Sequence, residues 1–171
     1  MNYTLEQFSN DCREALKTDS GPDGLERVRQ SVSKACSDQD FVTKYLGPDN
    51  EEPRKLLYED PSLGFCIFAH VYTGERGSPP HDHGPSWAVY GQAIGTTEMT
   101  DWKCLKKPTK DEPGLVEEVK TYTLTPGMAY AYQVGDLHSP YRFDTTKLIR
   151  VEGINMDNVK RDAYMVAPKQ S

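Results

Sequence analysis

Long apolar runs are missing from this sequence of 171 residues. No stretch approaches the roughly 20 consecutive apolar residues that cross a bilayer, so we expect no membrane partner. The amino terminus lacks a basic segment followed by an apolar one, and no signal peptide is expected. The net charge of −6 leaves no excess of basic residues for nonspecific nucleic-acid binding. A hydrophobic content of 36% and a charged content of 27% instead indicate a soluble globular protein.

Closely spaced cysteines are missing as well. The chain has four cysteines without any CxxC pair, and they are Cys12, Cys36, Cys66 and Cys104. We therefore expect neither a disulfide framework nor a zinc site made of thiolates. Reduced and mostly packed thiols are the expectation, which indicates a cytoplasmic protein.

Helical patterns are confined to residues 1–48, which we expect to form an N-terminal helical cap. Residues 4–18 begin with a capping-box pair and repeat apolar residues at helical spacing. Residues 24–36 carry a second apolar stripe, and a third short helix should end at Gly47-Pro48. None of these segments shows active-site chemistry, so the cap should cover one side or end of the remaining chain.

Short apolar or alternating runs, separated by glycine, proline and aspartate, fill residues 49–171. Such runs are typical of β-strands. The one long polar loop is expected over residues 106–115. The candidate strands are Phe65–Thr73, Trp87–Gly95, Glu118–Leu124, Met128–Gln133, Lys147–Ile154 and Ala163–Ala167. Many short strands without helices between them predict a sandwich, jelly roll or barrel that forms one structural domain with the cap.

Histidine is scarce, which makes its placement informative. The chain has four histidines, and two of them, His81 and His83, are separated by one residue. In an extended strand, residues i and i+2 point to the same face, so these two imidazoles can approach one metal ion. A third imidazole must come from His138 or His70, and we expect His138 in a turn-like stretch between two strands.

The surroundings of the histidine pair resemble the first motif of the cupin superfamily. That motif runs from a glycine to an HxH pair, a glutamate and a second glycine. Here His81 and His83 are followed by Gly95 at the closing position, and Ala88 stands in the glutamate position. The opening glycine is Gly74, with six intervening residues where the motif has five.

A second motif of the same superfamily surrounds the third histidine. It runs glycine, five residues, PxG, two residues and histidine. Gly127, Gly135 and His138 stand at this spacing, while Gln133 replaces the proline and Arg142 replaces the asparagine that usually follows. The two motifs together imply a mainly β fold, the cupin double-stranded β-helix or jelly-roll barrel, with a short N-terminal helical cap.

Within the cupins, the chain resembles the cysteine dioxygenase-like thiol dioxygenases. That group lacks the glutamate ligand, binds iron through three histidines and has short N-terminal helices. The resemblance implies that His81, His83 and His138 hold the metal. It also places Arg54 near the arginine that binds the substrate carboxylate, and Tyr72 near a pocket tryptophan.

The chain departs from this family at two places. Mammalian-type members have a cysteine cross-linked to a tyrosine where this chain has Ala88, and alanine cannot form that bond. The family's Ser-His-Tyr set follows the third ligand, but no histidine follows His138 here. Arg150 and Glu152 share a face of the comparable strand. The proton relay is therefore absent or replaced, and the substrate need not be cysteine.

Three neutral imidazoles leave the full +2 charge on a bound divalent ion. Three ligands on one side of an octahedral ion also leave positions for a bidentate organic anion and O2. We therefore predict an Fe(II)-dependent dioxygenase that acts on a small organic acid, with oxidation of a thiol acid to a sulfinate as its most specific form. The expected partners are the anionic substrate and O2, with no nucleic acid and no membrane, for a monomer or a homodimer.

The residues expected around the metal have two kinds of role. A guanidinium binds a carboxylate through two hydrogen bonds, so arginines are candidates for holding the substrate anion. The candidates for substrate binding are Arg54, Tyr72, Arg142 and Arg150. His70 and Glu152 are the candidates for proton transfer.

Two other classes of function stay open from the sequence. The same three histidines accept Zn, Ni or Mn, which would suit a non-oxidative isomerase or lyase. A cupin of this kind could also bind a small molecule without turnover, as a sensor or carrier.

Overall fold

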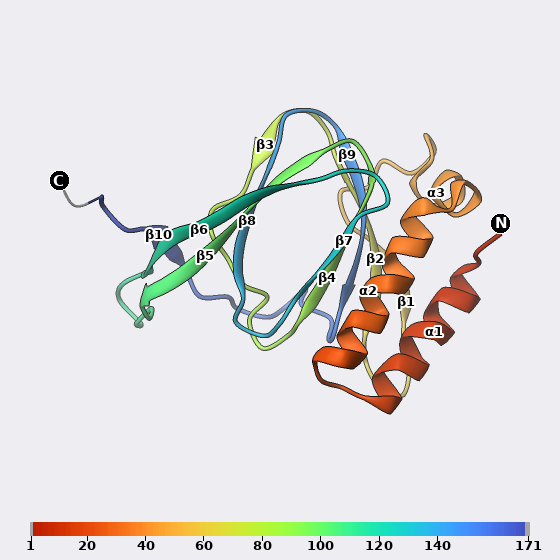
Figure 1. Ribbon diagram of the computed structural model, residues 1–171, viewed down its shortest axis with the longest axis horizontal. Helices are drawn as coiled ribbons and strands as arrows, with labels where there is room; N and C mark the ends of the chain where they lie inside the picture. The colour runs from red at the N-terminus through yellow and green to blue at the C-terminus, as the bar shows by residue number, and fades with distance from the viewer. Residues whose placement is uncertain (1, 170–171) are drawn as a thin grey trace.

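The computed structural model describes residues 2–169, which begin with helices and continue with strands (Figure 1). The helices are α1 Leu5–Thr18, α2 Pro22–Ser37 and α3 Gln39–Leu46. The strands are β1 Lys55–Glu59, β2 Cys66–Tyr72, β3 Arg76–Gly77, β4 Ala88–Ile94, β5 Thr97–Lys106, β6 Gly114–Leu124, β7 Ala129–Tyr132, β8 Leu137–Arg142, β9 Thr146–Glu152 and β10 Tyr164–Val166. No helix of residues 2–169 is long and apolar enough to cross a membrane.

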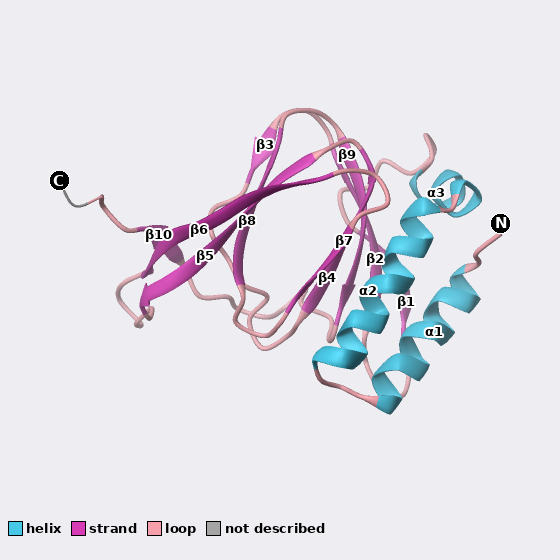
Figure 2. Cartoon of the chain, in the orientation of Figure 1, coloured by secondary structure: helices cyan, strands magenta, loops and turns pink. Residues whose placement is uncertain are grey.

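The strands form two five-stranded sheets that face one another as a double-stranded β-helix (Figure 2). The first sheet has the order β1-β2-β9-β4-β7, and the second has the order β10-β6-β5-β8-β3. Neighbouring strands are antiparallel except for β10 and β6, which run parallel. The prediction of a mainly β jelly-roll barrel preceded by helices is confirmed.

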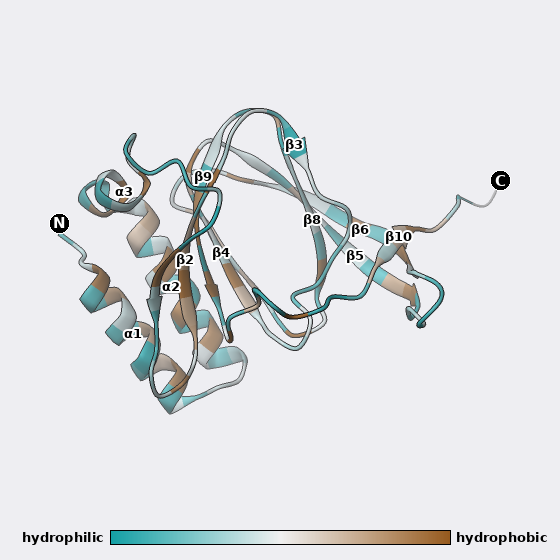
Figure 3. Ribbon diagram, turned by 180° about the vertical axis from the view of Figure 1, so that it is seen from behind, coloured by the Kyte–Doolittle hydropathy of each residue, from teal (hydrophilic) through white to brown (hydrophobic). Residues whose placement is uncertain are grey.

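The helices cover only the outer face of the first sheet (Figures 1 and 3). Their apolar stripes supply residues such as Phe8 and Val32, which pack on Val89 and Ile149 from the strands. The contact is close at Gly91 in β4, where an added Cβ would lie 2.3 Å from a methyl carbon of Val32. Any side chain there would force α2 away from the sheet. The helical segment therefore stabilises the barrel from outside.

The inner faces of the same strands line the barrel. Side chains alternate along a strand, so the residues between those that meet the helices point inward. An inner cluster includes Tyr90, Met99, Tyr132 and Leu148, all of them buried. Strands β2, β4 and β9 are thus buried on both faces. Their inner face carries most of the polar side chains, while Lys147 on the outer face donates to the carbonyl oxygens of Leu46 and Gly47 at the end of α3.

The structure corrects the expectation for the stretch around His138. It is the strand β8 and not a turn-like segment, and it pairs with β5 along its length. Pro140 weakened the sequence signal, because proline cannot donate to a strand ladder. Its position is tolerated because its nitrogen lies on the same edge of the strand as its carbonyl, which accepts from the backbone N–H of Ser78, so the pairing with β5 loses no hydrogen bond.

The expected strand and loop bounds differ from the observed ones in both sheets. Strand β5 was not predicted, although it has ten residues, and β1 was also missed. The expected polar loop over residues 106–115 is shorter, because β5 ends at Lys106 and β6 begins at Gly114. Charged residues on the exposed half of β5 hid its alternation.

A buried carboxylate connects the helical segment to the barrel. Asp60 is 2% exposed and accepts hydrogen bonds from the Arg13 guanidinium of α1, the Tyr58 hydroxyl and the backbone of Ser62 and Leu63. Burial by itself raises the pKa of Asp60, but these donors outweigh it and lower the pKa to about 2. The ionised form is therefore stabilised in the folded chain.

Replacing this carboxylate should change the acid stability of the protein. Because the pKa of Asp60 is lower folded than unfolded, its stabilising effect is complete above about pH 4 and is lost as the pH falls toward 2. Asp60→Ala should lower the free energy of unfolding by roughly 1–3 kcal/mol at pH 7. The difference from wild type should shrink at pH 3, as measured by urea unfolding. Asp111→Asn, in the exposed loop after β5, is the control and should behave as wild type at both pH values.

Candidate metal centre

Two distant segments of the chain bring three histidines together. His81 and His83 lie in the segment before β4, and His138 lies on β8. The backbone N–H groups of His81 and His138 each donate to the other residue's carbonyl at 3.0 Å. This bridge fixes the first motif against the second. One ligand atom from each of the three histidines lies within 4.8 Å of the other two.

The rings bring one nitrogen each to a common position. His81 donates its Nδ1 proton to the carbonyl oxygen of Pro79 at 2.9 Å, so its Nε2 has no proton in the neutral form. The Nε2 atoms of His83 and His138 are 3.2 Å apart. A divalent ion bound to both nitrogens at about 2.1 Å would set them roughly 3.0–3.4 Å apart. The three residues therefore fit a divalent metal ion.

The electrostatic environment keeps these rings neutral. Burial lowers the pKa of all three, to about 4 for His81 and further for His83 and His138. The guanidinium of Arg150 acts in the same direction on each ring. Neutral imidazole is the form that binds a metal.

Arg150 and Glu152 lie beside the histidines on the inner face of β9. Glu152 is fully buried, with Oε1 at 4.0 Å from Nδ1 of His83 and 3.9 Å from Nη1 of Arg150. Its cross-strand neighbour is Ala88, the residue in the position of the cupin glutamate. Because the alanine side chain is small, the longer side chain of Glu152 occupies this side of the site.

Arg54 reaches the same carboxylate from the loop before β1. Its Nη2 donates to Oε2 of Glu152 at 3.4 Å, and its Nε donates to Asp157 at 2.8 Å. The guanidinium also stacks on the Phe68 ring at 3.7 Å. Arg54 is therefore held between two carboxylates at the edge of the site.

The other three expected site residues lie deeper in the barrel. His70 donates from Nδ1 to the Pro53 carbonyl oxygen at 3.0 Å, and burial lowers its pKa well below the usual value. Tyr72 is two residues further along β2, with its ring stacked against His70. Arg142 ends β8, and its guanidinium lies 4.2 Å from the centre of the Tyr72 ring. The histidine cluster does not include His70.

A chain of hydrogen bonds next to His138 was not expected from the sequence. The Tyr132 ring stacks on His138 with centroids 4.0 Å apart, and its hydroxyl lies 2.7 Å from that of Tyr122. Tyr122 in turn donates to Asp101 at 2.8 Å. Asp101 belongs to β5, the strand that the pattern did not predict, so no sequence signal pointed to it. This chain fixes the Tyr132 ring against the third histidine.

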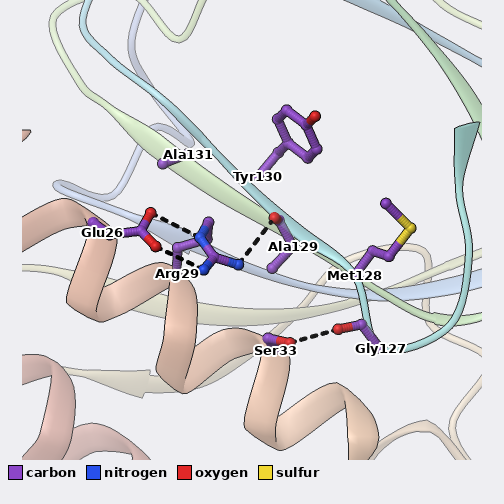
Figure 4. A pocket seen from close by; sticks show the side chains of 8 residues that line it. All are labelled: Glu26, Arg29, Ser33, Gly127, Met128, Ala129, Tyr130 and Ala131. Atoms are coloured by element: carbon purple, nitrogen blue, oxygen red, sulfur yellow. Dashed lines mark hydrogen bonds and ion pairs between the residues drawn. The ribbon is translucent and has the colours of Figure 1, made fainter. Parts of the chain in front are cut away.

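A surface groove of about 600 Å³ lies elsewhere, between α2 and β7 (Figure 4). Arg29 is paired with Glu26 through two hydrogen bonds, and Ser33 donates to the carbonyl of Gly127. Arg29 also donates to the carbonyl oxygen of Ala129, so Arg29 and Ser33 join the helix to β7 and the turn before it. The groove lies on the helical side of the sheet, so it is separate from the histidine cluster.

One divalent ion per chain should bind at the three histidines. His138→Ala should weaken Co(II) or Zn(II) binding by more than the roughly 10–100-fold that loss of an outer partner causes. His70→Asn removes a buried imidazole outside the cluster, so it should keep wild-type affinity. Competition with a chromophoric chelator measures both constants. Equal affinity of His138→Ala and wild type would rule out this site.

Comparisons with known proteins gave structural neighbours only. No family model matches the chain, and neither does any curated protein. KdgF from a Halomonas species is 15% identical, with 63% of this chain and 82% of that chain covered and a TM-score of 0.47. A cupin-2 domain protein from Shewanella frigidimarina is 15% identical, with 69% and 95% covered and a TM-score of 0.46. A double-stranded β-helix protein from Klebsiella pneumoniae is 15% identical, with 65% and 84% covered and a TM-score of 0.43. The structural neighbours of this chain thus include cupin-domain proteins.

Proposed function

We propose that the protein is a mononuclear Fe(II)-dependent dioxygenase that acts on a small organic acid. The observation that carries this proposal is the convergence of three neutral imidazoles without a carboxylate ligand. Oxidation of a thiol acid to a sulfinate is its most specific form, since the resemblance to thiol dioxygenases points to it. His81, His83 and His138 would hold the Fe(II) ion, and the ion would supply the redox chemistry by which O2 reacts with the substrate.

Arg150 is the residue proposed to orient the substrate. Its side chain is 12% exposed, and it shares with His83 the neighbouring carboxylate of Glu152, whose Oε1 lies 4.0 Å from Nδ1 of His83, so its guanidinium lies close to the site. Glu152 offers it only a long contact of 3.9 Å, which leaves its donors for a second carboxylate. A guanidinium holds such a group through two parallel hydrogen bonds, as an ammonium does not.

Glu152 is the residue proposed to hold a proton during turnover. Its Oε1 is buried and has no hydrogen-bond partner among residues 2–169. It lies at the edge of the histidine cluster, 4.0 Å from His83, on the strand comparable to the one that carries the Ser-His-Tyr set of the thiol dioxygenases. A carboxylate there can accept a proton from an incoming thiol or acid and return it to the product. Arg54 keeps the carboxylate in place from the other side.

The proposal is tested by oxygen uptake. The Fe(II)-loaded protein should consume O2 with a thiol acid such as cysteine or 3-mercaptopropionate, and the product should gain two oxygen atoms by mass spectrometry. Turnover that continues without O2 would indicate an isomerase or lyase instead. Stoichiometric iron with no O2 uptake across thiol acids and other organic acids would refute the dioxygenase.

Substitution of Arg150 separates substrate orientation from metal binding. Arg150→Met should raise KM for the acid by at least about tenfold, the effect of losing roughly 1.4 kcal/mol of binding. Arg150→Lys should recover little of it, because lysine lacks the planar fork. Metal content measured on the same samples should stay at the wild-type level. Arg29→Met, on α2 outside the barrel, is the matched control and should leave KM unchanged.

A further inference from the structure

Arg142 lies on the barrel wall beneath the histidine cluster. Along β8, His138, Pro140 and Arg142 alternate with residues that point outward, so these three face the interior. Arg142 is four residues beyond His138, which places their Cα atoms roughly 13 Å apart along the strand. Its guanidinium therefore belongs to a deeper part of the barrel than the metal ligands.

This arginine is buried more completely than most charged residues. It is 2% exposed, its guanidinium stacks on the Tyr72 ring at 4.2 Å, and Nη2 donates to the Tyr90 hydroxyl at 3.2 Å. Its Nε is buried and has no partner among the described residues. The side chain is thus held in one orientation with donors left over.

The hydrogen bonds behind Tyr90 supply no negative charge. Gln92 donates its Nε2 to a backbone carbonyl, so its Oε1 accepts from Thr97 at 2.9 Å. The Thr97 hydroxyl then accepts from Tyr90 at 3.0 Å, and the Tyr90 oxygen accepts from Arg142. Every proton in this chain points away from Arg142. It orients the guanidinium, but it leaves the positive charge uncompensated.

The buried carboxylate of the barrel is already engaged elsewhere. Glu152 lies 3.4 Å from Arg54 and 3.9 Å from Arg150. Within residues 2–169, no carboxylate lies within 4.0 Å of the Arg142 guanidinium. An uncompensated buried charge destabilises the folded state, so an anion beside Arg142 would stabilise the fold.

A second free donor lies at the same end of the barrel. Thr146 is fully buried, and its Oγ1 has no partner in the described part of the chain. Thr146 is the cross-strand neighbour of Tyr72 in the pairing of β2 with β9. The Arg142 guanidinium stacks on the ring of the same tyrosine. His70 does not contribute a donor, because its Nδ1 proton goes to Pro53 and only a lone pair stays on Nε2.

We propose that Arg142 and Thr146 form an internal carboxylate-binding site, which we call the deep site. The guanidinium supplies the charge and the free N–H donors, and the hydroxyl supplies one more. The carboxylate comes either from a free small acid or from the far end of a substrate whose other end lies at the histidines. The deep site does not require a metal, so it goes beyond the proposed function; only the second source rests on that function.

The test uses the chelator-treated full chain, titrated with acetate, succinate, glutarate and adipate at constant ionic strength. Thermal unfolding and calorimetry should show saturable stabilisation of the wild type. Arg142→Met should weaken binding at least tenfold, and without carboxylate it should unfold no lower than wild type, because it removes an uncompensated charge. Arg142→Lys keeps the charge and loses the fork, so it should bind with intermediate affinity.

Arg76→Met is the matched control. Arg76 is exposed and stacks on Tyr72 at 4.9 Å, next to Arg142 across strands β3 and β8. This variant should keep the wild-type response. Three results would each overturn the deep site. They are no stabilisation of the wild type by carboxylates, equal stabilisation of Arg142→Met, and a loss of carboxylate binding in Arg76→Met as large as in Arg142→Met.

A second arm distinguishes the two sources of the carboxylate. If it is the far end of a substrate, Co(II) loading should tighten the binding of dicarboxylates of suitable length and leave acetate unchanged. If it is a free acid, Co(II) should change neither. With either source of the carboxylate, binding should depend on Arg142. Failure of the proposed function would appear as absent O2 uptake, while the response of the metal-free protein would persist.

Discussion

The central constraint of this structure is the burial of strands β2, β9 and β4 on both faces. One face is mostly apolar, because α1, α2 and α3 pack on it. The other face encloses the barrel, and there the chain places His70, Arg150 and Glu152 among aromatic residues. Because side chains alternate with a period of two, a slip of one residue in any of these strands would exchange the two sets. The packing of the helices and the chemistry of the interior therefore depend on the same register.

Charge inside the barrel is distributed unevenly. Glu152 lies within ion-pair distance of both Arg54 and Arg150, next to the histidines. Arg142 instead contacts aromatic rings and the hydroxyl of Tyr90, which carry no negative charge. A divalent ion would add further positive charge at the three imidazoles. The whole interior is thus suited to anions. The proposal that the protein acts on a small organic acid rests on this distribution of charge.

The sequence located the three-histidine cluster because both of its halves are short-range patterns. The HxH pair needs only local extended backbone, and the glycines before His138 mark the second motif. The environment of the cluster depends on pairings across the sheets. Arg54 and Glu152 are separated by 98 positions along the chain, and Tyr132 reaches Asp101 through Tyr122 on another strand. Sequence patterns within one segment do not predict contacts between segments that are far apart in the chain.

The sequence by itself determined the helical segment, the mainly β barrel and the three histidines, because local periodicity and fixed spacing encode these features. Only the tertiary structure decided which face of each strand is enclosed and which charges meet there. It placed His138 on a strand despite Pro140 and left His70 outside the cluster. The physical reason is that burial and charge compensation depend on strands far apart in the chain, and only folding brings them within a few ångströms of one another.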